Sequence, residues 1–152
     1  MDQCGNDLIF SYSTTPLTTF TNAGVVGHGW SEDTGQVQDS GFNRERGANE
    51  YQKRGGAGEC PGNLKNSANF NMVVDKSDPM YDVLVTAINN NDVIAAAETN
   101  EPIGTAGGKG WAGNFRVTQA NETNPVDNAS TMAVNFSAIQ GQVVDPFVDP
   151  TV

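Results

Sequence analysis

The sequence lacks most of the residues on which common enzymes and membrane proteins depend. It has one histidine, His28, and two cysteines, Cys4 and Cys60, among 152 residues. No apolar run approaches the roughly 18 residues that a transmembrane helix needs, so we expect no membrane span. The N-terminal residues are acidic and polar, without the basic start and apolar stretch of a secretory signal. We therefore expect the chain to fold in a cytosol, with both cysteines as free thiols.

The scarcity of histidine also argues against catalysis. His28 lies in a Gly-His-Gly-Trp setting, and the common Ser/His and Cys/His nucleophile systems would rest on this one residue. Residues 104–110 resemble a phosphate-binding loop, but glycine follows the lysine and the segment precedes a predicted strand. The acidic residues between 75 and 82 lack the ligand pattern of a calcium loop. The sequence therefore predicts no enzyme activity, no cofactor and no metal.

Basic residues are few and unevenly placed. The chain has 8 Lys and Arg against 18 Asp and Glu, a net charge of -10, which is unsuited to gripping phosphates but suits a surface past which DNA slides. Five of the basic residues fall within residues 44–65, interleaved with acidic residues. A solvated, mixed-charge loop and a contact zone between copies of the chain both remain open interpretations of this stretch.

Short alternating segments indicate a mainly β domain. Apolar residues alternate in residues 8–12, 69–74 and 132–137, which is typical of strands with one buried face. Residues 111–120 are also predicted as a strand, and its proximity in sequence to the 132–137 strand favours an antiparallel hairpin. We further expect a short strand at Val25–Val26, ended by glycines.

One segment has the period of a helix. Asp78 is a suitable cap and Pro79 suits the first turn. Apolar residues follow from Met80 to Ile88 at positions i, i+3, i+4, i+7 and i+8, and three asparagines then favour a stop. For residues 92–99, the alanines favour a helix whereas the short length and the preceding asparagines favour a strand, and we expect a strand.

Two segments are predicted to lack regular structure. Residues 31–63 are rich in glycine and charge and poor in large apolar residues, so we expect a long flexible loop that a partner orders or that contains a weak hairpin. Two Asp-Pro steps in residues 143–152 favour extended backbone and argue against a central strand. We therefore predict a single domain over residues 1–142 and an extended C-terminal tail.

The second half of the chain resembles tail tube proteins of long-tailed bacteriophages. The resemblance lies in Asn69-Phe-Asn-Met-Val-Val-Asp-Lys-Ser-Asp-Pro-Met-Tyr-Asp-Val-Leu, in Gly113-Asn-Phe-Arg-Val-Thr-Gln and in Ala129-Ser-Thr-Met-Ala-Val-Asn-Phe-Ser. It is a likeness of topology: strand, single helix, further strand and final hairpin. The segment 31–63 departs from it, because no long hairpin is evident there.

This resemblance implies a β-sandwich or barrel-like subunit with one flanking α-helix, a fold that type VI secretion tube proteins share. It also implies a structural virion protein, assembled in the bacterial host cytoplasm. Six copies would form a ring, and rings would stack into a tail tube that contacts other tail proteins and passes DNA without binding it specifically. From the net charge we expect acidic groups in the bore.

Other functions remain open at this stage. A capsid decoration protein would bind a shell, a carbohydrate-binding module would need exposed aromatics such as Trp30, Tyr51 and Trp111, and a hydrolase would use paired carboxylates. Under the tail tube hypothesis, the loop 31–63 and the tail make contacts between subunits. The candidate contact residues are Arg44, Arg46, Glu50, Lys53, Arg54, Glu59 and Phe147.

Overall fold

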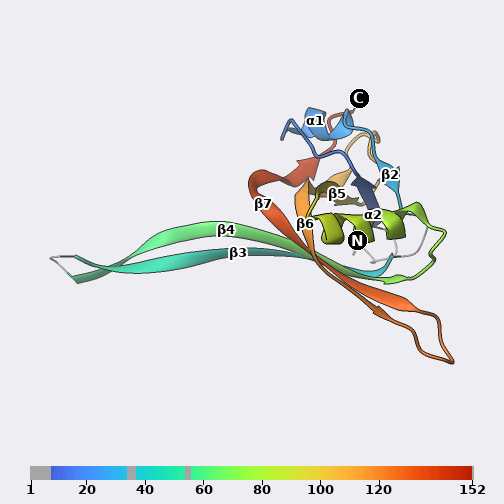
Figure 1. Ribbon diagram of the computed structural model, residues 1–152. Helices are drawn as coiled ribbons and strands as arrows, with labels where there is room; N and C mark the ends of the chain where they lie inside the picture. Colours follow the sequence, from blue (N-terminus) through green and yellow to red (C-terminus); the bar gives the residue numbers. More distant parts are fainter. Residues whose placement is uncertain (1–7, 34–36, 54–55, 152) are drawn as a thin grey trace.

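The computed structural model describes residues 8–33, 37–53 and 56–151. Seven strands and two short helices occur in these ranges (Figure 1). The elements are β1 (Ile9–Ser13), α1 (Asn22–Val26), β2 (Ser31–Glu32), β3 (Val37–Lys53), β4 (Gly56–Val73), α2 (Pro79–Asn90), β5 (Val93–Thr99), β6 (Lys109–Thr123) and β7 (Thr131–Val148). Neither helix has the length and apolar character to cross a bilayer, within the residues described. The mainly β prediction is confirmed.

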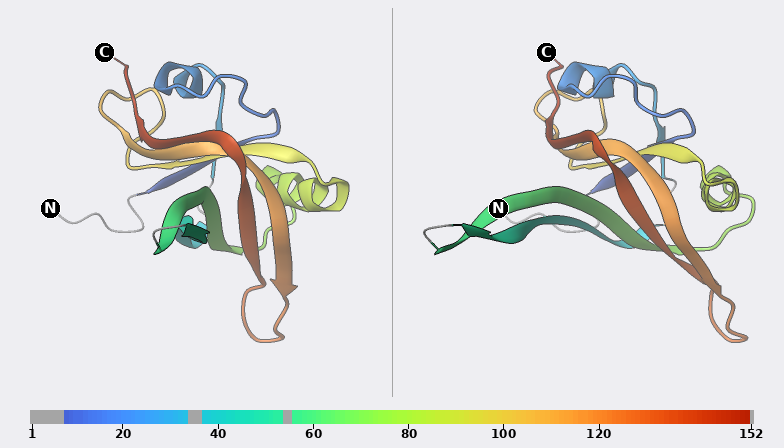
Figure 2. Two further views of the ribbon diagram at one scale, coloured as in Figure 1. Left: turned by 90° about the vertical axis from the view of Figure 1, so that its left-hand side faces the viewer. Right: turned by 60° about the vertical axis from the view of Figure 1, so that its left-hand side comes forward.

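All seven strands form one antiparallel sheet in the order β2-β1-β5-β6-β7-β4-β3. The sheet curls over itself, because Phe10 of β1 and Phe70 of β4 touch with ring centroids 4.9 Å apart although three strands separate them in the sheet. Phe42 of β3 likewise stacks on Trp111 of β6, at 4.6 Å. The curled sheet gives the barrel-like shape visible in Figure 2.

The main hydrophobic core lies inside this curl. The rings of Phe10, Phe70, Phe115 and Phe136 contact one another there. Helix α2 closes the core with three buried side chains, Met80, Leu84 and Ala87. The sequence predicted this helix because its apolar residues follow a helical period, and the prediction is confirmed.

The ends of α2 follow the predicted signals. The Asp78 carboxylate accepts a hydrogen bond from the Met80 backbone N–H at 3.0 Å, and Pro79 opens the first turn. Asn91 ends the helix in the left-handed conformation, with φ of 56°, which asparagine tolerates better than most residues. The strand expected at residues 92–99 is also confirmed as β5.

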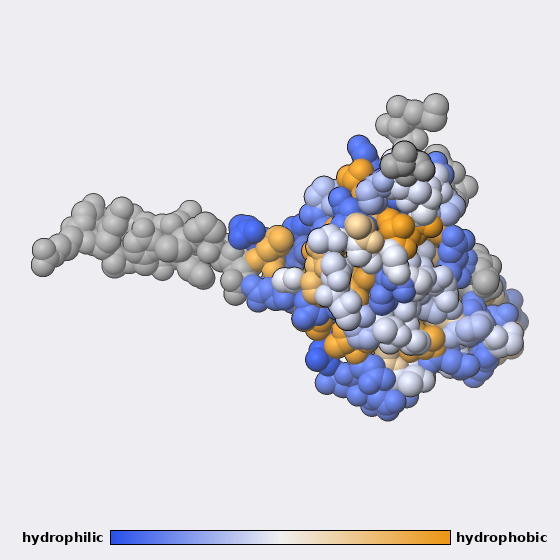
Figure 3. All heavy atoms as spheres, turned by 90° about the horizontal axis from the view of Figure 1, so that it is seen from above, coloured by the Kyte–Doolittle hydropathy of each residue, from blue (hydrophilic) through white to orange (hydrophobic). Residues whose placement is uncertain are grey.

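A second, smaller core lies on the outer face of the sheet, beneath α1. Ala95, Ala97 and Ala112 face this core from β5 and β6, whereas Ile94 and Ala96 face the main core. Both faces of β5 are therefore buried, which explains why this strand does not alternate between apolar and polar residues. On the surface seen in Figure 3, apolar residues form separate patches among polar ones.

The short strand predicted at Val25–Val26 is wrong, because these residues end helix α1. The Thr21 hydroxyl accepts a hydrogen bond from Gly24 N–H at 3.1 Å and caps the helix. Val25 is fully buried in the second core, and its carbonyl accepts a hydrogen bond from the Trp30 indole N–H at 2.7 Å. The local cap thus outweighs the strand preference of two valines, and the described residues contain two helices rather than one.

The prediction of an extended C-terminal tail outside the domain is also corrected. Residues 143–148 continue β7 and pair with β6, including Val144 with Ala112 and Val148 with Lys109. Pro146 fits because β4 pairs with β7 only up to Ser137, so this half of β7 is paired along one edge among the described strands. Asp149 then fixes the end of the chain, since its carboxylate accepts the Gly104 N–H at 2.7 Å.

Candidate assembly surface

A long two-stranded arm, formed by β3 and β4, projects from the body (Figure 1). The paired residues run from Val37 with Met72 near the body to Lys53 with Gly56 at the far end. Residues 31–63, predicted as a long flexible loop that a partner orders or that contains a weak hairpin, therefore contain β2, all of β3 and the outer part of β4. The flexible-loop interpretation is corrected to a long hairpin. A ribbon that projects from the body has no core against which to bury one face, so its sequence shows no apolar alternation.

The arm has few contacts with the rest of the chain beyond its root. Strand β4 pairs with β7 between Ser67 and Val73, and its outer residues pair with β3 alone among the described strands. Two-stranded ribbons are marginally stable by themselves in water. Packing against another surface would therefore stabilise the arm.

The root of the arm is fastened to β7 by an ion pair. Arg44 Nη2 donates to Asp145 Oδ1 at 2.8 Å, and Arg44 Nε donates to Oδ2. The Arg44 side chain is 54% exposed and that of Asp145 is 12% exposed. The Arg44 guanidinium also lies 4.7 Å from the centroid of the Phe42 ring, which stacks on Trp111 in the core. The contact thus links the arm to the interior of the body.

A groove opens where the arm and β7 diverge. Its volume is about 780 Å³, and Arg46, Leu64 and Lys65 line the arm side while Ile139 and Val143 line the β7 side. Pairing between β4 and β7 stops at Ser67 with Ser137. Leu64 is 42% exposed and lines the groove opposite the apolar Ile139 and Val143. The groove therefore combines diverging strand edges with an exposed apolar residue, features that favour contact with another chain.

Four strands form a layer with two open margins. The layer consists of β3, β4, β7 and β6 in spatial order. Strand β3 pairs only with β4 among the described residues, and β5 pairs with β6 only from Gly110 to Arg116. Within the described part of the chain, residues 117–123 of β6 therefore have a strand neighbour on one side only. Helix α2 flanks this margin, where the Tyr81 hydroxyl donates to the Glu122 carboxylate.

The strand directions make these two margins complementary. Because all adjacent strands in the layer are antiparallel, β3 and β6 run in opposite directions. The β3 margin of one copy can therefore lie beside the β6 margin of the next copy as an antiparallel pair. Repetition of this head-to-tail contact around an axis generates a ring.

The predicted contact residues have different locations. Arg44 and Arg46 are exposed at the arm root. Glu50 and Lys53 lie in β3 and Glu59 in β4, and Glu50 pairs with Glu59 in the backbone register. The side chains of these three, and the whole of Arg54, lie outside what the structure describes.

The prediction that Phe147 contacts a neighbouring subunit is wrong. Its side chain is fully buried in the second core, so it stabilises the subunit itself. Asp145 also contacts the arm, although its place in an Asp-Pro step predicts only extended backbone. Its acidic side chain could have been paired with a basic arm residue only if the fold had been known.

Little in the described residues supports chemistry. His28 Nε2 lies 2.6 Å from the Thr15 carbonyl oxygen and its ring contacts Trp30. No group of three or more potential metal ligands occurs in the described part of the chain. Trp111 is 5% exposed and belongs to the main core, so it cannot serve as the exposed aromatic of a carbohydrate site.

Comparison with solved structures identifies the fold. The SPP1 tail tube has a TM-score of 0.68 and 12% identity, covering 97% of this chain and 78% of that one. The tail of an empty gene transfer agent particle, with C6 symmetry, has a TM-score of 0.63 and 11% identity over 93% and 97% of the two chains. The chain has the fold of tail tube proteins.

The same fold extends to injection systems. The sheath/tube terminator of an extracellular contractile injection system, PVC, has a TM-score of 0.56 and 15% identity, covering 95% of this chain and 96% of that one. No protein-family model matches the sequence. No curated protein matches it either. The tail tube likeness therefore resides in the three-dimensional arrangement, which the sequence preserves without close identity.

Proposed function

We propose that this chain is the structural subunit of a virion tail tube. Copies join through the β3 and β6 margins into closed rings, and rings stack through the β3–β4 arm. The observation that carries the proposal is the four-stranded layer with complementary margins and a projecting arm at its side. The C6 symmetry of the gene transfer agent tail supports six copies in a ring.

The arm is the element that we assign to stacking. Its charged residues, Arg44, Arg46, Glu50, Lys53, Arg54 and Glu59, are the proposed contacts with a neighbouring ring. Interleaved charges of both signs suit this role because they fix register and disfavour wrong pairings. The proposed output is a hollow filament in the virion tail, assembled in the bacterial host cytoplasm, that contacts other tail proteins and passes DNA without catalysis.

Electron microscopy of the concentrated, purified protein tests this function. Hollow tubes of uniform diameter are the expected result. A chain that stays monomeric at every concentration, while retaining its folded spectrum, would contradict the proposal.

An arm-shortened variant tests the role of the arm separately. Arg46 pairs with Leu64 in the hairpin, so replacing residues 47–63 by Asn-Gly closes the ribbon with a favoured two-residue turn. We expect this variant to fold and to lose tube growth. A control variant shortens the exposed 124–129 loop of the β6–β7 hairpin and should still form tubes. Equal tube growth by the arm-shortened variant would refute the role of the arm.

A further inference from the structure

The outer face of the four-stranded layer is uncharged over its centre. Paired residues share a face of a sheet, so the register places Asn43 with Ser67, and Asn69 with Asn135, on the same surface. Asn43 Nδ2 lies 3.4 Å from the Ser67 hydroxyl, and the Asn135 amide donates to Gln119 of β6. Asparagine, serine and glutamine thus extend across all four strands of this face.

Two further contacts define the same surface. A Cβ atom on Gly41 would lie 2.7 Å from Asn69 Oδ1, so the Asn69 amide lies across the β3 backbone. Asn69 and Asn135 line two shallow depressions on this face, and Asn71, Ala133 and, at the end of the layer, Asp39 complete one of them. The described residues at the centre of the face are therefore neutral.

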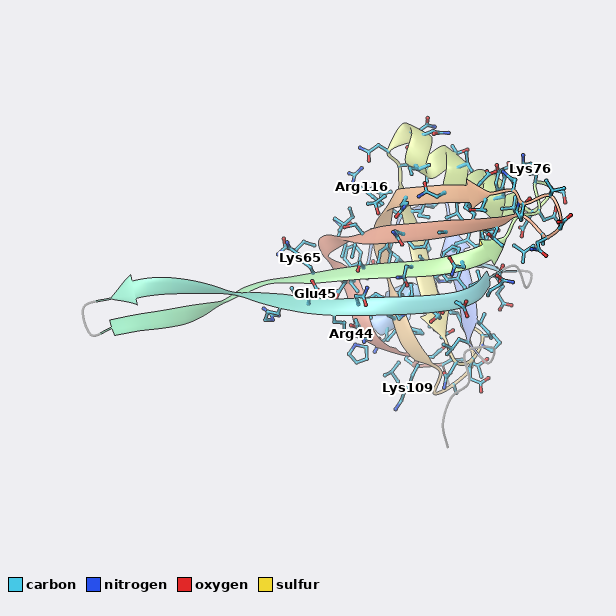
Figure 4. The ribbon with its side chains drawn as sticks, turned by 90° about the horizontal axis from the view of Figure 1, so that it is seen from below. Arg44, Glu45, Lys65, Lys76, Lys109 and Arg116 are labelled. Carbon is cyan, nitrogen blue, oxygen red and sulfur yellow. The ribbon has the colours of Figure 1, made fainter. Side chains whose placement is uncertain are left out.

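Charged residues of the layer lie at the border of this face. The register places Asp39 beside Asn71 at one end, and Glu45 beside Lys65 where the arm leaves the body. Arg116 lies at the β6 side, where its guanidinium donates to the Asn91 carbonyl at 2.8 Å. Figure 4 views this side of the molecule, with Glu45, Lys65 and Arg116 marked. Two acidic and two basic residues cancel at the border, although the whole chain carries -10.

The position of the body decides which way this face points in a ring. The main core, α2 and strand β1 all lie on the other side of the layer. When copies join margin to margin around an axis, the bulky side of each layer must lie outward, because its helices and second core would overlap near the axis. The bare face therefore points inward.

From this geometry we infer that neutral amide and hydroxyl side chains line the centre of the bore, and that DNA passes a wall without net charge, because the few charges at the border of the face balance. The inference rests on the proposed function and identifies the lining. It differs from the acidic bore expected from the net charge, because the described residues at the centre of the face are neutral and the two acidic residues at its border, Asp39 and Glu45, are matched by Lys65 and Arg116. Because the two cations of this face, Lys65 and Arg116, are matched by two carboxylates, passing phosphates should release few counterions, and DNA retention should be weak at any salt concentration. An amide that binds a DNA phosphate gives up a hydrogen bond to water, so the net gain in binding free energy is small.

A lysine-bearing bore gives a direct test. Asn69 and Ser137 are both exposed on the inward face, so Asn69→Lys combined with Ser137→Lys adds two cations per subunit to the bore. The matched control, Thr18→Lys combined with Ala23→Lys, adds the same charge at exposed positions beside the second core. Tubes of each variant and of the unmodified protein are incubated with a fluorescent single-stranded oligonucleotide and then treated with nuclease.

We expect nuclease-protected oligonucleotide in the Asn69/Ser137 variant alone. Protection should fall at least tenfold between 50 and 200 mM salt, as expected for several phosphate contacts (roughly 10³-fold or more for six to ten). Equal protection in the control, or none in the Asn69/Ser137 tubes, would overturn the assignment of this face to the bore.

A second measurement covers the case in which the lysine variant fails to assemble. Cryo-electron microscopy of unmodified tubes, at a resolution that shows side chains, should place Asn69 and Asn135 against the bore. Tubes in which another face of the subunit, with a net acidic surface, lies against the bore would overturn the inference and leave the proposed function intact. Absence of tubes from the unmodified protein would overturn both.

Discussion

Breaking the ion pair at the arm root should weaken assembly more visibly than folding. Arg44 donates to both carboxylate oxygens of Asp145, and the Arg44 side chain is 54% exposed. Exposed pairs contribute about 0.2–1 kcal/mol, with bidentate geometry at the upper end. Asp145 is mostly covered, at 12% exposed, so we expect a coupling free energy of roughly 0.5–1 kcal/mol. The Phe42 contact adds a cation–π contribution of about 0.5 kcal/mol.

A double-mutant cycle isolates the coupling between the two charges. The cycle uses Arg44→Gln, Asp145→Asn and the double variant, each unfolded in urea at low salt and again at about 1 M salt, where the Debye length is roughly 3 Å. The coupling should be present at low salt and fall at high salt, with unchanged m-values. Arg44→Lys keeps the charge but loses the two-pronged geometry, so its stability should lie between those of the unmodified protein and Arg44→Gln.

The same variants should change the concentration needed for tube growth. Each subunit carries one arm root, and 1 kcal/mol corresponds to about a fivefold change in an equilibrium constant. We therefore expect Arg44→Gln to raise the critical concentration a few-fold, measured by sedimentation, and the charge-reversed pair Arg44→Asp with Asp145→Arg to restore it partly. A coupling energy of zero at low salt, or one that salt does not reduce, would refute the ion pair as the fastening of the arm.

Three further changes test the interior. Phe147→Ala should lower the free energy of unfolding by about 3–5 kcal/mol, which a lower urea midpoint would show. An unchanged midpoint together with loss of tubes would instead indicate that Phe147 contacts a neighbouring subunit. Burial raises the pKa of Glu98 above its ordinary value of 4.5. The folded chain therefore binds the Glu98 proton more tightly than the unfolded chain does. The free energy of unfolding should fall as the pH rises from 4.5 through the raised pKa. Glu98→Gln should remove that fall from a series of melting temperatures, and an unaltered pH profile would exclude Glu98 as its source. Gly110→Ala would place a Cβ 1.8 Å from the Glu98 carbonyl oxygen and should lower the free energy of unfolding by about 1–3 kcal/mol or more. In the control Gly108→Ala, the nearest atom to the added Cβ lies at 3.3 Å, so its melting temperature should stay close to that of the unmodified protein.

Local signals in the sequence predicted the elements that are stabilised locally. Helix α2 has a cap at Asp78, a proline at its first turn and an apolar stripe, and each of these acts within a few residues. The strand around Phe70 likewise alternates because one of its faces is buried. These predictions depend on no knowledge of distant contacts.

The arm and the C-terminal strand depend on contacts that a linear reading does not contain. The outer part of the arm extends beyond the body, so no buried face imposes a period on its residues. Val144 and Phe147 are held in the second core by β6 and by the segment around Leu17, which are distant in sequence. Asp145 acquires its partner because the arm root returns beside β7, 101 residues from Arg44.

The composition of the arm favours ordered assembly over aggregation. An exposed two-stranded ribbon with apolar side chains would pair with any strand edge and form disordered aggregates. Charged residues and glycines in this arm lower that attraction, so a single arm contact is too weak to hold two copies together. A closed ring presents all of its arms to the next ring at once, and simultaneous contacts raise the effective concentration of each one. We therefore expect ring closure to precede stacking, which sedimentation of the arm-shortened variant would reveal as isolated rings.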